Sequence, residues 1–319
     1  MEAMDITSMS KQTFEFQYPF KFERDFNEES TIQWMSQNWS CSITLSAVYV
    51  AVIFGLKYFM QSRPKYDLRP QLIAWSGILA LFSIASTIRL LSESIYVTVR
   101  HGWEYSVCSP TIYFGDTAIW AFLFAASKGY ELGDTVFIVL RKQPLIFLHW
   151  YHHITVMIYS WYTYAYFYAP GRWYASINSL VHSFMYSYYF LKAMRFYVPR
   201  WVNMFVTSIQ LTQMAFGIYV NLSAKWVLER GDACHVTHDN IKYSLLMYAS
   251  YFLLFGHFFY NAYLKPKDSA SKSNAHAQTY QNGAAVKTTV GGGGDGRCTG
   301  AMTNGHASPV LANGKQKYM

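Results

Sequence analysis

Three closely spaced histidines, His149, His152 and His153, are the residues of this chain best suited to chemistry. Residues three and four positions apart share one side of a helix, so the three imidazoles should point in broadly the same direction. They lie inside an apolar run that begins near Leu145, and a membrane segment does not carry such groups without a use. An imidazole can act as a nucleophile. A zinc or iron ligand cluster, or a helix end with interfacial histidines, are the alternative interpretations.

A second group of polar residues interrupts an earlier apolar run. Lys128 and Glu131 are three positions apart, and Glu131 and Thr135 are four apart. With Asp134 they predict a polar stripe along one helix. Charges inside a membrane should pair and face the interior of a helix bundle. A purely structural ion pair is the alternative interpretation.

Two later runs carry further polar side chains. His182 stands four positions before Tyr186, and Thr207, Gln210 and Gln213 follow at every third position. A lone histidine among tyrosines is also typical of a packing residue, and glutamine in a membrane helix often bonds to a neighbouring helix. By themselves these two groups do not indicate a functional site. They indicate one only together with the three histidines and the polar stripe.

Composition predicts the elements that hold these residues. Of the 319 residues, 52% are hydrophobic, 19% aromatic and only 14% charged. A membrane-spanning helix needs about 20 apolar residues, and seven runs are long enough. We therefore predict an all-α integral membrane protein with seven transmembrane helices. The runs are 41–60, 72–99, 112–140, 145–168, 173–192, 201–224 and 241–264.

The membrane domain is predicted to cover residues 41–264. Residues 1–40 are polar and acidic, without the apolar segment of a signal peptide. Residues 265–319 are polar and of low complexity, a composition that cannot bury enough apolar surface to fold, so we expect a disordered tail.

The polar residues are expected to lie at one depth. At 1.5 Å per residue, Glu131 and Asp134 lie ~9–14 Å from one end of their helix. His152 lies ~10 Å, His182 ~15 Å and Gln210 ~14 Å from the corresponding ends of theirs. Four helices therefore contribute to a single predicted site.

Basic residues predict the orientation. Loops after the odd-numbered runs carry more Lys and Arg, which places the N-terminus in the lumen and the C-terminus in the cytosol. The net charge of +8 lies largely in loops and the tail, so nucleic acid is a poor explanation of it. Cys108 and Cys234 then fall in lumenal loops, where a disulfide can form, although both could be unpaired. Asn38 and Asn221 begin glycosylation sequons that lie too close to a helix for reliable use.

The chain ends in Lys315-Gln316-Lys317-Tyr318-Met319. Lys315 and Lys317 resemble a dilysine signal for retrieval to the endoplasmic reticulum, which is read from the cytosol. A chance pair of lysines in a basic tail is the alternative interpretation. We expect a multi-pass protein of the endoplasmic reticulum membrane.

Four motifs in order resemble the ELO family of very-long-chain fatty acid elongases, over about residues 40–265. The segment from Glu131 to His153 is similar to the subgroup that takes saturated and monounsaturated acyl chains near palmitate. The motifs are Lys128-x-x-Glu131-Leu132-x-Asp134-Thr135, His149-x-x-His152-His153, His182-x-x-Met185-Tyr186-x-Tyr188-Tyr189 and Thr207-x-x-Gln210-x-x-Gln213.

The resemblance implies a 3-ketoacyl-CoA synthase, which catalyses the first step of an elongation cycle. Such an enzyme condenses an acyl-CoA with malonyl-CoA and releases carbon dioxide and CoA. The resemblance also implies a six-helix barrel, formed by spans two to seven, around an acyl tunnel closed at the lumenal end. No cofactor or metal is expected. The expected partners are membrane lipid and the ketoreductase, dehydratase and enoyl reductase of the cycle, with a homodimer as a candidate assembly.

The nucleophile is expected among the histidines, because the four cysteines lie outside the polar layer. We assign His152, the middle histidine of the family motif, with His182 assisting acyl transfer. Glu131 and Asp134 would orient imidazoles or Lys128, as a carboxylate does in a catalytic triad. The candidate catalytic residues are His152, His182, His149, His153, Glu131 and Asp134. The candidate substrate-binding residues are Lys128, Arg141, Lys142, Tyr188, Thr207, Gln210, Gln213, Tyr260 and Lys265.

A basic mouth is predicted at the cytosolic end, where Arg side chains could bind CoA phosphates bidentately. Charge that merely reports topology is the alternative interpretation. The residues are Arg141, Lys142, Arg195, Arg200 and Lys265.

Two other function classes remain open. A membrane di-iron desaturase or hydroxylase also carries His-x-x-His-His, but it needs about eight imidazoles to hold two irons. The polar layer offers four, with His257 nearby. A non-catalytic seven-span receptor would not require the charged stripe of Lys128 and Glu131.

Overall fold

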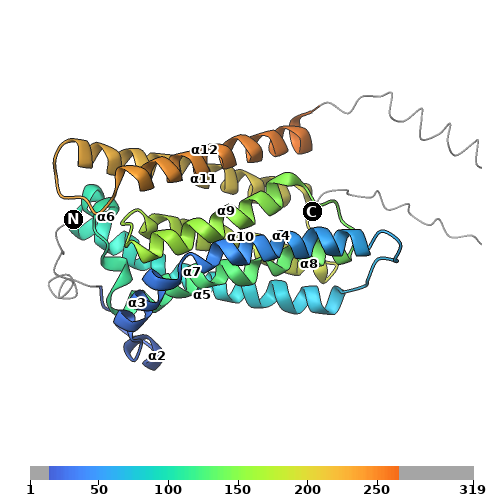
Figure 1. Ribbon diagram of the computed structural model, residues 1–319, viewed down its shortest axis with the longest axis horizontal. Coiled ribbons are helices and arrows are strands. Elements are labelled where there is room, and N and C mark those ends of the chain that lie inside the picture. Colours follow the sequence, from blue (N-terminus) through green and yellow to red (C-terminus); the bar gives the residue numbers. More distant parts are fainter. Residues whose placement is uncertain (1–13, 266–319) are drawn as a thin grey trace, which may run out of the picture. The chain divides into compact units, whose positions relative to one another are not determined.

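The computed structural model describes residues 14–265, and within them every regular element is a helix (Figure 1). The described residues up to Tyr260 belong to one compact unit, and a second unit begins at Asn261. Lys315 and Lys317, predicted as a retrieval signal, lie outside the described residues.

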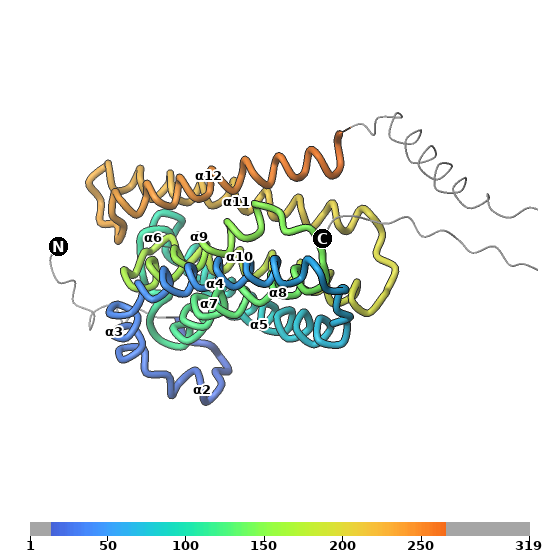
Figure 2. Tube along the Cα trace, turned by 45° about the vertical axis from the view of Figure 1, so that its right-hand side comes forward, coloured from blue at the N-terminus to red at the C-terminus, as the bar shows by residue number. Residues whose placement is uncertain are grey.

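Each predicted apolar run coincides with helical structure. Helices α5 and α10 lie side by side, as do α11 and α12, and α4 lies against α8 and α9 (Figures 1 and 2). The long helices are α4 (Cys41–Phe59), α5 (Arg69–His101), α9 (Phe147–Ala165), α10 (Gly171–Ala193), α11 (Arg200–Glu229) and α12 (His238–Phe259). A π-helical turn, Tyr260–Leu264, follows α12.

Two of these helices, α4 and α5, are long and apolar enough to cross a membrane by length and composition. Helices α9 to α12 are also long, but their buried residues include many tyrosine, serine, asparagine and histidine side chains. These side chains lower the mean hydropathy of helices whose polar groups face inward.

Local sequence explains where the helices begin and end. Pro70 occupies the first turn of α5, a position where proline's missing N–H is not needed. Gly102 ends α5 with a φ of 91°, a conformation that favours glycine. The Thr237 side chain caps α12 by accepting a hydrogen bond from the Asn240 backbone N–H.

The third predicted run, 112–140, differs from a single helix. It contains two 3₁₀ turns, η2 (Thr111–Tyr113) and η3 (Gly115–Thr117), and then α7 (Ala118–Glu131) and α8 (Gly133–Leu140), separated at Leu132. At Gly133 the chain passes so close to Trp75 of α5 that a Cβ would come within 2.6 Å of the indole ring. Just after the break, Gly133 and Asp134 of α8 therefore lie close to α5.

The segment before the first long helix is folded. It forms α2 (Lys21–Arg24) and α3 (Glu28–Asn38), and Met35 of α3 is fully buried. The Glu23 carboxylate accepts hydrogen bonds from Trp120 of α7, at 2.7 Å, and pairs with Arg89 of α5, at 2.9 Å. Buried ionic contacts therefore attach this segment to the helix bundle.

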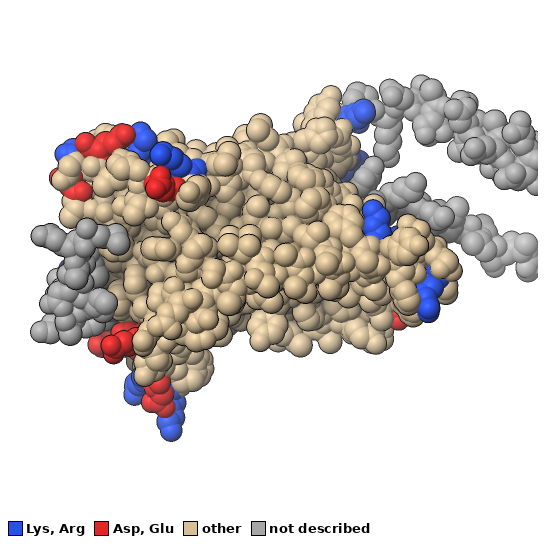
Figure 3. Space-filling model, viewed as in Figure 1, with Lys and Arg blue, Asp and Glu red and all other residues tan. Residues whose placement is uncertain are grey.

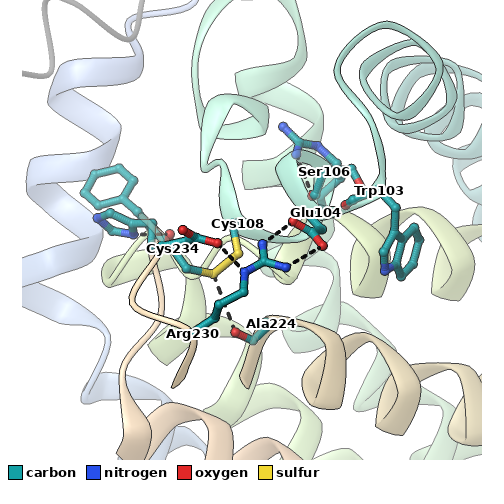
Figure 4. The surroundings of a disulfide bond; sticks show 11 residues. Trp103, Glu104, Ser106, Cys108, Ala224, Arg230 and Cys234 are labelled. Atoms are coloured by element: carbon teal, nitrogen blue, oxygen red, sulfur yellow. Dashed lines mark hydrogen bonds and ion pairs between the residues drawn. A yellow bond between two sulfur atoms is a disulfide. The ribbon is translucent and has the colours of Figure 1, made fainter. Parts of the chain in front are cut away.

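One end of the bundle is held by a covalent link, and we call it the disulfide end. Cys108, the last residue of α6 (Trp103–Cys108), is bonded to Cys234 in the loop after α11 (Figure 4). Beside it, Arg230 forms an ion pair with Glu104 at 2.5 Å (Figure 4). The buried Arg172 of α10 also donates to the Ser106 carbonyl of α6.

The opposite end, which we call the Arg141 end, contains the loops after α4, α8 and α10. The Tyr66 backbone N–H donates to the Leu140 carbonyl at 3.1 Å, and the Arg69 side chain donates to the Ala193 carbonyl at 2.8 Å. Figure 3 shows charged side chains gathered towards the two ends, with a broad band of uncharged residues between them on the visible face. Such a band is typical of a surface that contacts lipid.

Candidate active site

A cavity of about 50 Å³ lies among the helices. Its wall is formed by side chains of η2, α7, α9, α10, α11 and α12, most of them apolar or aromatic. His152 is the one histidine among the described residues that lines it. The cavity therefore combines a long apolar wall with a single imidazole.

Helical periodicity places His152 in this wall. Val156, Tyr159 and Thr163 follow it at i+4, i+7 and i+11, and all four line the cavity. The His152 ring lies 4.9 Å, centre to centre, from the Tyr251 ring of α12. His152 is thus the polar end of a stripe along α9.

His149 and His153 occupy different surroundings from His152. The His149 Nε2 atom lies 2.9 Å from the Thr135 hydroxyl of α8, which lies 2.6 Å from the Tyr49 hydroxyl of α4. The rings of His149 and His153 are 4.5 Å apart. His153 is buried, and its Nδ1 atom has no hydrogen-bond partner within residues 14–265. Only His152 of the three is open to the cavity.

A buried charged cluster lies beside the cavity. Lys128, which is 1% exposed, donates to the Glu131 carboxylate at 2.8 Å and to the Asn178 Oδ1 atom at 2.8 Å. The Ser127 hydroxyl donates to the same Glu131 oxygen at 3.0 Å, and the His182 Nδ1 atom lies 3.6 Å from it. The stripe predicted from the sequence is therefore an ion pair on α7 that joins two residues of α10.

Asp134 is held by aromatic donors. The Trp75 indole N–H donates to one carboxylate oxygen at 2.6 Å, and the Tyr186 hydroxyl donates to the other at 2.8 Å. The Tyr186 ring in turn contacts the His182 ring, with centres 5.4 Å apart. Asp134 thus fixes an aromatic neighbour of His182.

Among the candidate substrate-binding residues, Gln213 lines the cavity. The Gln210 amide donates to the Met185 sulfur at 3.3 Å, and the Thr207 hydroxyl donates to the Asn203 carbonyl at 3.1 Å. Tyr188 is buried, with the Lys192 ammonium 5.2 Å from its ring centre. None of these three is in the cavity wall formed by the described residues.

The basic candidates of the first unit, Arg141, Lys142, Arg195 and Arg200, are not among the residues that line the cavity. Lys142 is exposed, and its ammonium donates to the Gln61 carbonyl at 3.3 Å, within the Arg141 end. Arg195 and Arg200 are exposed. Tyr260 is 52% exposed after α12, and Lys265 is exposed in the second unit.

Three residues at the site escaped the sequence analysis. They are Tyr49, Trp75 and Asn178, whereas Tyr186 was named for its spacing from His182. Asn178 stands four positions before His182, and this spacing was the available signal. Tyr49 and Trp75 reach the site only through tertiary packing of α4 and α5, for which the sequence offered no signal.

Comparison with known proteins finds clear relatives. The family model described as "ELO: GNS1/SUR4 family" matches residues 34–271. The very long chain fatty acid elongase 6 of Drosophila melanogaster is 47% identical over 271 residues, which are 84% of this chain and 86% of that protein. The Homo sapiens protein of the same name is 47% identical over 256 residues, or 80% and 96% of the two chains. The putative fatty acid elongase 3 of Caenorhabditis elegans is 44% identical over 246 residues, or 76% and 77%.

Proposed function

This chain belongs to the ELO family of fatty acid elongases, and from that membership we propose how its residues condense an acyl-CoA with malonyl-CoA. It is an integral membrane acyltransferase, a 3-ketoacyl-CoA synthase. The desaturase and receptor alternatives are set aside by this membership.

One observation supports the assignment of the nucleophile. His152 is the imidazole that opens into a mostly apolar and aromatic cavity, while His149 and His153 are engaged with Thr135 and with each other. An acyl chain that fills the cavity would bring its thioester to His152. A thioester that is held beside the His152 imidazole reacts with the rate advantage of an intramolecular reaction.

The first half-reaction is acyl transfer to His152. An imidazole nitrogen attacks the thioester carbonyl, the carbon–sulfur bond breaks, and the imidazole proton passes to the departing CoA thiolate. In the second half-reaction, malonyl-CoA loses carbon dioxide and its C2 carbon attacks the acyl carbonyl. The carbon–nitrogen bond then breaks, and the leaving imidazole nitrogen takes up a proton from water, which restores His152.

The surrounding residues orient these groups. Glu131 lies between Lys128 and His182 and would fix the His182 ring, and Asp134 would do the same through Tyr186. His182 would assist acyl transfer or contact the second substrate. The basic candidates of the Arg141 end would contact the CoA phosphates, as would Lys265 and Tyr260 beyond α12, while Thr207, Gln210, Gln213 and Tyr188 would contact the thioester and malonyl groups.

The substrate is proposed to be a saturated or monounsaturated acyl-CoA near palmitoyl. Support comes from the sequence between Glu131 and His153 and from the 47% identity with elongases of the sixth type. The other proteins of the cycle, a ketoreductase, a dehydratase and an enoyl reductase, would take the product onward.

The membrane arrangement is also a proposal. Seven spans, α4, α5, α7 with α8, and α9 to α12, would cross the endoplasmic reticulum membrane, and all but α4 would form a six-helix barrel. The disulfide end would face the lumen, where disulfides form, and the Arg141 end the cytosol. The uncharged band between the charged ends supports this arrangement (Figure 3).

The test is direct. Microsomes that hold this protein are incubated with labelled malonyl-CoA and a panel of acyl-CoAs, beside microsomes that hold the His152→Ala variant. We expect a labelled 3-ketoacyl product with two more carbons, formed fastest from palmitoyl-CoA and absent with the variant. Equal labelling with both proteins would overturn the assignment.

A further inference from the structure

Asn178 lies at the junction between the charged cluster and the cavity. Gly171, Tyr174, Ala175 and Asn178 all line the cavity, at the i, i+3, i+4 and i+7 positions of α10. Asn178 is 7% exposed. Its side chain therefore shares the cavity wall with His152.

The Lys128 ammonium fixes the direction of the Asn178 amide. A lysine ammonium only donates hydrogen bonds, so the Asn178 atom 2.8 Å from Lys128 Nζ must be the oxygen. Lys128 is itself fixed, because Glu131 accepts from it at 2.8 Å and the Phe124 ring lies 4.3 Å from the ammonium. The Asn178 NH₂ group must therefore point away from Lys128.

No acceptor for the Asn178 NH₂ group is found among residues 14–265. Of the hydroxyls in the cavity wall, those of Tyr164 and Tyr174 also have no hydrogen-bond partner within the described residues, whereas Tyr159 donates to Asn240 at 2.8 Å. The other amide of the wall, Gln213, lacks such an anchor in the described part of the chain. Asn178 is thus an amide donor of the cavity wall whose direction is fixed by Lys128 and which is free to bind a ligand.

We propose that Asn178 is a catalytic residue whose Nδ2–H donates a hydrogen bond to the thioester carbonyl oxygen during acyl transfer. This inference rests on the proposed function. When His152 attacks, the carbonyl electron pair moves onto oxygen, and Asn178 stabilises the resulting oxyanion. The oxyanion then collapses, the carbon–sulfur bond breaks and CoA leaves with the imidazole proton. A donor fixed before the reaction stabilises such an oxyanion without reorganisation.

The test measures the first half-reaction alone. Full-length protein is incubated with palmitoyl-CoA without malonyl-CoA, and the release of free CoA is followed. Asn178→Asp keeps an oxygen for Lys128 but replaces the donor with an acceptor. We expect CoA release at saturating palmitoyl-CoA to fall by about 100-fold or more, with KM and the thermal stabilisation by palmitoyl-CoA within a few-fold of the wild type.

Asn240→Asp is the matched control. Asn240 is also buried, and its Oδ1 atom accepts from Tyr159, but it lies in the first turn of α12, where an acidic side chain is favourable. We expect its rate of CoA release to stay within a few-fold of the wild type. CoA release by Asn178→Asp at the wild-type rate overturns the proposal, as does loss of stabilisation by palmitoyl-CoA in that variant. A wild-type protein that releases no CoA overturns the proposed function itself, before any variant is measured.

Discussion

At the scale of single residues, the site separates histidines that are adjacent in the chain. His152 opens into the cavity, whereas its neighbour His153 is buried against His149. Both were expected on one side of the helix together with His149. Successive residues of a helix point about 100° apart. This difference in direction lets the His152 ring face the cavity while the His153 ring packs against a neighbouring histidine.

This difference predicts two outcomes for alanine variants. Incubated with labelled acyl-CoA alone, the wild type should release CoA and retain the acyl label. His152→Ala should lose the label, because the nucleophile is missing, while His149→Ala should retain part of it and fail to elongate. Mass spectrometry of the labelled protein measures both. Normal labelling of His152→Ala would move the assignment to His182.

The buried charge pair predicts a stability effect. Lys128→Met leaves the Glu131 carboxylate buried without its main partner, and breaking such a pair costs about 3–5 kcal/mol of unfolding free energy. The double variant Lys128→Met/Glu131→Gln removes both charges and should recover most of this loss without recovering elongation. Thermal unfolding in detergent checks the first point and product formation the second. A double variant no more stable than the single one would contradict the pair's role.

At the scale of elements, α4 reaches the site from outside the proposed barrel. The buried Tyr49 hydroxyl lies 2.6 Å from Thr135, whose hydroxyl lies 2.9 Å from His149 Nε2. When Tyr49 donates to Thr135 and Thr135 donates to His149 Nε2, the His149 proton sits on Nδ1. In the opposite arrangement, His149 donates to Thr135 and Thr135 donates to Tyr49. The Tyr49 hydroxyl hydrogen would then have no acceptor among the described residues. The first span therefore positions a motif histidine.

Tyr49→Phe tests this link. Losing one buried hydrogen bond costs about 1 kcal/mol of stability, but kcat should fall several-fold and its pH profile should shift, because His149 is free to change tautomer. Tyr58→Phe is the control, since Tyr58 is on the same helix and 75% exposed. Equal kinetics and pH profiles for the two variants would show that α4 is only a packing element.

The sequence predicts the elements better than their contacts. Long apolar runs predict α4, α5 and α9 to α12, because each of these helices carries apolar side chains along its whole length, facing either the other helices or the surface of the bundle. The short α3 and α6 carry no such run and were missed. The Lys128–Glu131 pair follows from spacing within one helix, whereas the contacts of Asn178 with Lys128 and of Trp75 with Asp134 join different helices. Only packed side chains reveal those.

At the scale of the whole described unit, one end is fastened far more firmly than the other. The disulfide joins residues 126 positions apart in sequence, and the Arg230–Glu104 ion pair lies beside it (Figure 4). The loops of the Arg141 end meet through hydrogen bonds such as Lys142 with Gln61. Motion that admits a substrate is therefore expected at the Arg141 end.

Removing the disulfide should destabilise the protein substantially. Cys108→Ser opens a loop of more than 100 residues, which in the chain-entropy model costs about 4–5 kcal/mol. Cys41→Ser, at an exposed free cysteine, should have no effect. Thermal unfolding compares the two variants, and mass spectrometry of non-reduced peptides should find Cys108 linked to Cys234. Free thiols at both positions would contradict the link.

We propose that Lys315 and Lys317 of the tail direct retrieval of the protein to the endoplasmic reticulum. Changing Lys315 and Lys317 to Ser should let part of the protein reach later compartments, because the retrieval coat no longer binds. Microscopy against markers of the endoplasmic reticulum and Golgi measures this. An unchanged location would remove the dilysine interpretation without affecting the enzyme.

The deep part of the cavity wall has a consequence for the evolution of this sequence. Gly171 lies against Tyr113, whose hydroxyl donates to the Tyr168 carbonyl at 3.0 Å, and a Cβ at position 171 would collide with that hydroxyl. Neither position can therefore change alone without disturbing the wall. Among descendants and relatives, a side chain at position 171 should be accompanied by a smaller residue at position 113. Relatives that have other residues at both positions should have a cavity of different depth. They should therefore accept a different set of acyl substrates.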